Sequence, residues 1–73
     1  MAAEIIVTLD VMLARRKRRA KDLAAEIGMT EANLSLLKSG KVKGVRFDTL
    51  AKLCEALDCT PGELLEVAVN DVE

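Results

Sequence analysis

Few side chains in this sequence have the chemistry for catalysis or metal binding. Histidine is absent, so no imidazole can act as a base or a metal ligand near neutral pH. Cys54 and Cys59 lie five residues apart without a third ligand nearby, which argues against a zinc site. A disulfide between them would close a very small loop and gain little. We expect two reduced thiols, Cys54 buried among apolar side chains and Cys59 at a helix end.

The length of the chain restricts its function further. The 73 residues are expected to form one small domain, with little room for a ligand pocket of about 300 Å³. Phe47 is the only aromatic residue, so the core has to be built from aliphatic side chains and methionine. We therefore expect no enzyme, no cofactor and no metal. So small a core is marginally stable, and dimerisation would stabilise it.

Charge is distributed unevenly along the chain. The formal net charge is −1, but residues 15–46 hold ten basic and three acidic side chains, a net charge of +7. The remainder holds one lysine and nine acidic side chains, a net charge of −8. This split favours a basic face that binds a polyanion and an acidic face turned away from it. The alternative is that the charge runs only keep a small domain in solution.

Residues 5–14 resemble a signal peptide only superficially. The basic run follows the apolar stretch instead of preceding it, and Asp10 interrupts the stretch, which is too short to span a bilayer. We expect a soluble protein that is not exported and has no membrane partner. Binding of residues 15–21 to a membrane surface is a weak alternative, because the polar face there is short.

Hydrophobic periodicity divides the chain into five helices between two strand-like ends. The helices are expected at residues 9–17, 20–27, 30–39, 47–57 and 61–65, the strands at 4–9 and 66–69, and a frayed acidic tail at 70–73. Gly28 and Gly40 stand where helices end, and Thr30 where a helix is capped. Residues 60–63, Thr-Pro-Gly-Glu, form a capping box with proline at the first helical position.

The most informative segment is residues 23–37. Two helices joined by a short turn must pack closely if the second is to project from the surface. Ala24 offers a small side chain at the crossing, Gly28 supplies the turn, and Thr30 caps the projecting helix. The shared core is expected to comprise Ile27, Met29, Leu34 and Leu37. Together these features predict a helix-turn-helix.

Residues 9–66 resemble the Cro/C1-type (Xre family) helix-turn-helix domain of phage repressors and bacterial regulators, in particular its short single-domain members. The resemblance rests on Leu23-Ala24, Ile27-Gly28, Thr30, Leu34-Ser35, Lys38-Ser39-Gly40-Lys41, Arg46-Phe47, Thr49-Leu50, Leu53-Cys54, Ala56-Leu57 and Pro61-Gly62-Glu63-Leu64-Leu65. It implies an all-α, five-helix, lambda-repressor-like fold, a recognition helix at about residues 30–39 in the DNA major groove, usually a dimer, and no cofactor. The implied function is sequence-specific regulation of transcription, such as repression, in the cytoplasm and on the DNA of a bacterium or phage.

The resemblance also assigns individual contacts. By this resemblance, the residues that contact base edges are Glu31, Ala32, Asn33, Ser35 and Leu36. The chemistry agrees, because asparagine can read adenine, glutamate can accept from cytosine, and apolar side chains suit thymine methyls. The alternatives are ordinary polar surface residues at Asn33 and Ser35, and a partly buried core position for Leu36. The residues that the resemblance assigns to phosphate or minor-groove contacts are Arg19, Lys21, Thr30, Lys38, Lys41, Lys43 and Arg46. Such contacts position the protein on DNA without specifying its sequence.

The sequence departs from the family pattern at the start of the second helix. Arg19 replaces the usual capping residue, and Ala20 stands where a glutamine often reaches DNA. Arg18 stands where the family usually buries an apolar side chain. We expect no base contact from this end of the second helix, and Arg18 and Arg19 either at phosphates or simply exposed.

Two other functions fit parts of the sequence. An antitoxin of the same fold would bind a toxin protein through the acidic half and use DNA binding to control its own operon. A toxin-like gene beside this one would indicate that role. RNA binding is disfavoured because the chain lacks aromatic side chains on which bases stack.

The strand-like termini bear on assembly. One recognition helix covers only a few base pairs, so useful specificity needs two on a pseudo-palindrome. We expect a homodimer whose interface includes residues 5–9 and 66–69. The alternative is a monomer in which the two termini pair with each other and close the domain.

Overall fold

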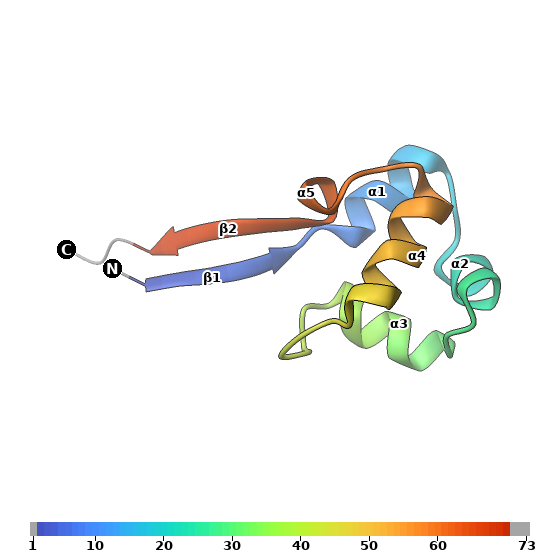
Figure 1. The fold of residues 1–73 in the computed structure, drawn as a ribbon, viewed down its shortest axis with the longest axis horizontal. Helices are drawn as coiled ribbons and strands as arrows, with labels where there is room; N and C mark the ends of the chain where they lie inside the picture. Colours follow the sequence, from blue (N-terminus) through green and yellow to red (C-terminus); the bar gives the residue numbers. More distant parts are fainter. Residues whose placement is uncertain (1, 71–73) are drawn as a thin grey trace.

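A two-stranded ribbon projects from a body of five helices (Figure 1). The computed structural model describes residues 2–70. In chain order the elements are β1 (Ala2–Val7), α1 (Leu9–Arg16), α2 (Ala20–Ile27), α3 (Glu31–Lys38), α4 (Phe47–Leu57), α5 (Pro61–Leu64) and β2 (Leu65–Asn70). The five predicted helices are confirmed, and the structure is mainly helical with a short antiparallel sheet.

Local signals set the turn between α2 and α3. Gly28 ends α2 in the left-handed region, with φ of 77°, where a side chain would be strained. The amide of Met29 donates a hydrogen bond to the carbonyl oxygen of Ala24 at 2.9 Å, which closes the end of the helix. The hydroxyl of Thr30 accepts the amide of Asn33 at 3.1 Å and caps α3. The predicted turn and cap are both confirmed.

The strand boundaries differ from those predicted. β1 covers residues 2–7 instead of 4–9, because the carbonyl of Thr8 accepts the amides of Val11 and Met12 at 3.2 and 3.3 Å and the chain turns into α1. The amide of Thr8 donates to the carbonyl of Leu64 at 2.7 Å, which ties the base of the ribbon to α5. α5 ends at Leu64, so β2 begins one residue early and continues through Asn70. The rest of the predicted tail, residues 71–73, lies outside the described residues.

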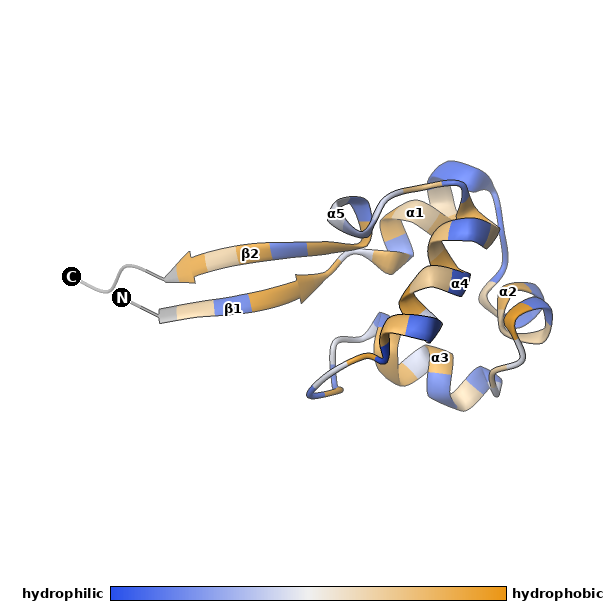
Figure 2. Cartoon of the chain, in the orientation of Figure 1, coloured by the Kyte–Doolittle hydropathy of each residue, from blue (hydrophilic) through white to orange (hydrophobic). Residues whose placement is uncertain are grey.

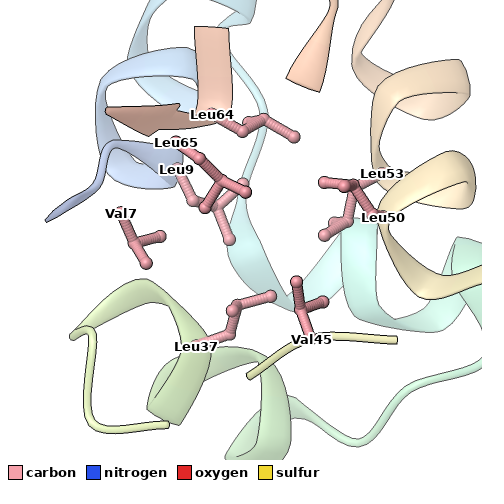
Figure 3. A pocket seen from close by; sticks show the side chains of 8 residues that line it. All are labelled: Val7, Leu9, Leu37, Val45, Leu50, Leu53, Leu64 and Leu65. Atoms are coloured by element: carbon pink, nitrogen blue, oxygen red, sulfur yellow. The ribbon is translucent and has the colours of Figure 1, made fainter. Parts of the chain in front are cut away.

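The core joins the helices to the base of the ribbon. Among the residues whose burial is described, 3–69, those that are buried are all apolar: Leu9, Met12, Leu13, Leu23, Ala24, Ile27, Leu34, Leu37, Leu53, Leu57 and Leu64. Figure 3 shows Val7 and Leu65 of the ribbon pointing toward Leu37 of α3 and Leu53 of α4. The space left among these side chains is about 10 Å³, room for one water at most. Packing at the ribbon base therefore fixes the C-terminal end of α3.

Candidate nucleic-acid interface

The buried face of α3 orients its outward face. Leu34 and Leu37 are buried against the core, together with Ala24 and Ile27 of α2. Met29, in the turn, is partly buried against the same cluster. With α3 anchored along this side, the residues between Leu34 and Leu37 and those in the first turn have to face away from the body.

All five residues that the resemblance assigns to base edges lie on this outward face. Glu31, Ala32, Asn33, Ser35 and Leu36 are exposed. Leu36 is 46% exposed and lies outside the core cluster, so it is not a partly buried core residue. The backbone amide of Asn33 is used by the cap of α3, which leaves its side-chain amide on the surface. The face thus offers a carboxylate, an amide, a hydroxyl and two apolar groups within two helical turns.

A groove runs beside this face. It has a volume of about 210 Å³ and lies between α3 and the segment that leads into α4. Asn33 and Leu36 line it on one side, and Val42, Arg46 and Thr49 on the other. Phe47 is exposed next to Arg46, at the first position of α4. Sequence reasoning assigned Phe47 no role, since an exposed and a buried aromatic residue look alike in the sequence.

The predicted phosphate contacts flank α3 on both sides. Lys41, Lys43 and Arg46 are exposed in the segment after α3, and Lys38 is half-buried in its last turn. Arg46 pairs with Asp48 at 3.3 Å, but both side chains remain well exposed, so the pair is weak and open to competition from a phosphate. At the start of α2, Arg19 and Lys21 are exposed, whereas Ala20 packs partly against the core. Ala20, which is partly buried and has no polar side-chain group, therefore cannot make the base contact that a glutamine often makes at this position.

Two arginines of the basic run do not belong to the predicted basic face. Arg16 donates two hydrogen bonds to the end of α4, from Nε to the carbonyl of Leu57 at 2.7 Å and from Nη2 to the carbonyl of Asp58 at 2.9 Å. Arg18 donates to the carbonyl of Ala56 at 3.2 Å. Figure 1 shows the end of α1 beside the end of α4, on the opposite side of the body from α3.

Arg18 also forms an ion pair with Glu26 of α2 at 2.6 Å. The expectation that Arg18 contacts phosphate or is simply exposed is therefore wrong, because the side chain is half-buried and bound within the fold. The two arginines occupy carbonyls that a helix end leaves unpaired and complement its negative dipole. The hydrogen bonds to the end of α4 join residues about forty positions apart in the chain. The only indication of them in the sequence is the arginine at position 18, where the family usually has an apolar residue.

The two thiols lie near the C-terminal end of α4. Cys54 is half-buried, not fully buried as predicted, and Cys59 follows the end of α4. Burial, followed by the neighbouring Cys54, raises the pKa of the Cys59 thiol, which therefore stays protonated at neutral pH. Between residues 2 and 70, no three acidic or thiol side chains come together as an ion-binding group. No helix in that part of the chain is long and apolar enough to cross a bilayer.

Comparison with known proteins agrees with this arrangement. The model of the Cro/C1-type HTH DNA-binding domain matches residues 8–68. Over 62 residues the chain is 52% identical to the uncharacterized HTH-type transcriptional regulator YozG of Bacillus subtilis (strain 168), which covers 85% of this chain and 74% of that protein. The fold is similar to the crystal structure of a "putative DNA-binding protein" from Bacteroides fragilis, with a TM-score of 0.78 and 28% identity over 86% of this chain and all of the other.

Proposed function

Because this chain belongs to the Cro/C1-type family of helix-turn-helix DNA-binding domains, we propose that it regulates transcription by laying α3 in the major groove of a specific DNA duplex. The observation that carries the proposal is the outward face of α3, where the five predicted base-reading residues are exposed together. An α-helix fits the width of the major groove, where each base pair presents a distinct pattern of donors, acceptors and methyl groups.

In this proposal the outward face of α3 reads bases, and the basic side chains around it position the protein on the DNA backbone. Asn33 forms two hydrogen bonds with an adenine, Glu31 accepts from a cytosine amino group, and Ala32 and Leu36 contact thymine methyls. Phosphates are bound by the cations around this face, which are Arg19 and Lys21 at the start of α2 and Lys41, Lys43 and Arg46 after α3.

A single α3 covers too few base pairs for a unique site. The protein therefore acts as a homodimer on a pseudo-palindrome, with two copies of α3 about 34 Å apart in successive turns of the major groove. A binding site of this kind lies in the promoter of a bacterial or phage gene, so we expect the protein in the cytoplasm, where it blocks transcription.

Substitutions at Asn33 and Lys41 separate reading from positioning. Asn33→Ala is expected to cost about 1–3 kcal/mol at one base position and to relax the preference for that base. Lys41→Ala is expected to weaken binding to all sequences alike, since a phosphate contact carries no sequence information. Fluorescence anisotropy with a panel of single-base operator variants measures both effects. If Asn33→Ala lowers the affinity for every duplex by the same factor, Asn33 is not a base reader.

A further inference from the structure

One face of the β ribbon carries only apolar side chains. In the antiparallel register Ala3 pairs with Val69, Ile5 with Val67, and Val7 with Leu65. Side chains of directly paired residues point to the same face of a sheet, and successive residues alternate between faces. These six residues, which we call the apolar ribbon face, therefore lie together. The opposite face holds Glu4, Ile6, Glu66 and Ala68, with two carboxylates.

The helical body covers only the base of the apolar ribbon face. Val7 and Leu65 pack against the core. Farther out, Ile5, Val67 and Val69 are 60%, 66% and 53% exposed, and the ribbon extends away from the body (Figure 2). A strand pair that is entirely apolar on one face and carries its charges on the other is typical of a sheet with one buried face. A two-stranded ribbon is also marginal in water by itself. The outer part of this face is therefore an unpartnered surface.

A groove continues this surface toward the DNA-binding side. It has a volume of about 180 Å³ and is mainly apolar, with one charged residue, Lys43. Its lining consists of Ile5, Val7 and Leu65 of the ribbon, Leu37 of α3, and Gly40, Val42, Lys43, Gly44 and Val45 of the segment between α3 and α4. The groove lies where the ribbon meets the body, so it can take the small apolar side chains at the tip of a second ribbon that lies antiparallel to the first.

We propose that the apolar ribbon face is the dimer interface, on which the same face of a second copy stacks about a two-fold axis through the middle of the ribbon. This proposal rests on the homodimer of the proposed function and assigns its surface. The face is self-complementary, because it carries no charge that would meet a like charge of the partner. The net charge of −1 adds little repulsion between copies.

The size of the surface suits a dimer that forms at micromolar concentrations and above. Burying three branched aliphatic side chains of such exposure removes on the order of 300 Å² of apolar surface from each copy. Over both copies, with the groove also covered, this amounts to roughly 600–800 Å², which is the size of a small, weakly associating interface. Pairing of ribbon edges would instead join two ribbons into a wider sheet and leave both apolar faces in water. Stacking of faces is therefore favoured over edge pairing.

The stack also places the DNA-binding helices. Six residues of strand span about 20 Å, and the longest dimension of one copy is 44 Å. Antiparallel ribbons that overlap over their length put one helical body at each end of the stack. The two copies of α3 are then separated by the stack, a distance of the order of the 34 Å between successive turns of the major groove.

Two neighbouring residues of β1 provide a matched test. Ile5 lies on the apolar ribbon face and Ile6, 41% exposed, on the opposite face. In sedimentation velocity of the full chain at 1–100 µM, we expect the wild type and Ile6→Lys to reach the dimer mass and Ile5→Lys to remain monomeric, with a dissociation constant raised at least tenfold. Circular dichroism shows whether both variants are folded. Val67→Thr keeps a strand-forming side chain and is expected to weaken the dimer, so that its sedimentation mass lies between those of the wild type and Ile5→Lys. A wild-type monomer at 100 µM, or equal effects of Ile5→Lys and Ile6→Lys, would overturn the proposal.

Crosslinking distinguishes stacked faces from paired edges. In a Cys54→Ser, Cys59→Ser background, Ile5→Cys places a thiol near the two-fold axis, where oxidation by copper phenanthroline is expected to join two copies rapidly. Ile6→Cys, one residue away on the opposite face, is expected to remain without a crosslink, and rapid crosslinking of Ile6→Cys in place of Ile5→Cys contradicts the stack. Both readouts are independent of DNA. If the wild type dimerises through Ile5 yet binds no duplex, the proposed function fails while the interface stands.

Discussion

Affinity for duplex DNA is expected to fall by roughly 10³- to 10⁵-fold between 50 and 200 mM salt. Six to ten phosphate contacts would produce a drop of this size through release of condensed counterions. Each copy presents Arg19, Lys21, Lys41, Lys43 and Arg46, exposed around α3 and the start of α2, so a dimer supplies enough cations for such a count. Titration of a labelled duplex at several salt concentrations measures the slope of log affinity against log salt.

One lysine variant and one arginine variant show which cations contribute to the slope of log affinity against log salt. Lys41→Ala removes one contact from each copy of a dimer, so the slope is expected to become shallower by about 2. Arg15→Ala serves as the control, because Arg15 is exposed in the last turn of α1, at the end of the body far from α3 (Figure 1). An affinity that does not respond to salt, or equal slopes for the two variants, contradicts binding through the α3 side.

The leucines of α3 are expected to differ sharply in their effect on stability. Leu34 is fully buried, so Leu34→Ala leaves a cavity in the core and is expected to cost about 2–5 kcal/mol of unfolding free energy. In a domain of this size that lowers the melting temperature by roughly 10–30 °C. Leu36→Ala, two residues along on the exposed face, is expected to change stability by about 0.5 kcal/mol or less.

Thermal melts followed by circular dichroism at one fixed protein concentration measure both variants. The concentration has to be fixed because dimerisation itself raises the melting temperature. The same pair reports on DNA: Leu36→Ala is expected to weaken binding to the operator while the fold stays intact. Equal melting temperatures for the two variants would mean that α3 does not pack on the core as described.

The helix-turn-helix could be predicted from the sequence because its requirements are local. Gly28 is needed for a positive φ, Thr30 for an unpaired amide in the first turn of α3, and Ala24 for a close helix crossing. Each acts within a few residues along the chain, so residue types and spacing are sufficient evidence. The exposure of the α3 residues followed from the same periodicity, once Leu34 and Leu37 were placed in the core.

Contacts between distant parts of the chain could not be predicted in the same way. A run of basic residues in the sequence gives the net charge of a segment but not the direction in which its side chains point. Arg16 and Arg18 turn away from α3 and bind carbonyl groups at the end of α4, 38 to 42 residues along the chain. The β-branched residues of the termini indicated strands, but their pairing within one chain depends on where α1 and α5 bring the two ends. The apolar ribbon face becomes visible only when the register is known.

Selection of bound sequences from a pool of random DNA duplexes shows whether α3 reads a specific sequence. We expect enrichment of one pseudo-palindrome whose half-sites are centred about one helical turn, 10–10.5 base pairs, apart. An Asn33→Ala protein carried through the same selection is expected to lose the preference at one position of each half-site and to keep the rest. Retained duplexes that bind with salt-dependent affinity but share no motif would contradict sequence reading by α3.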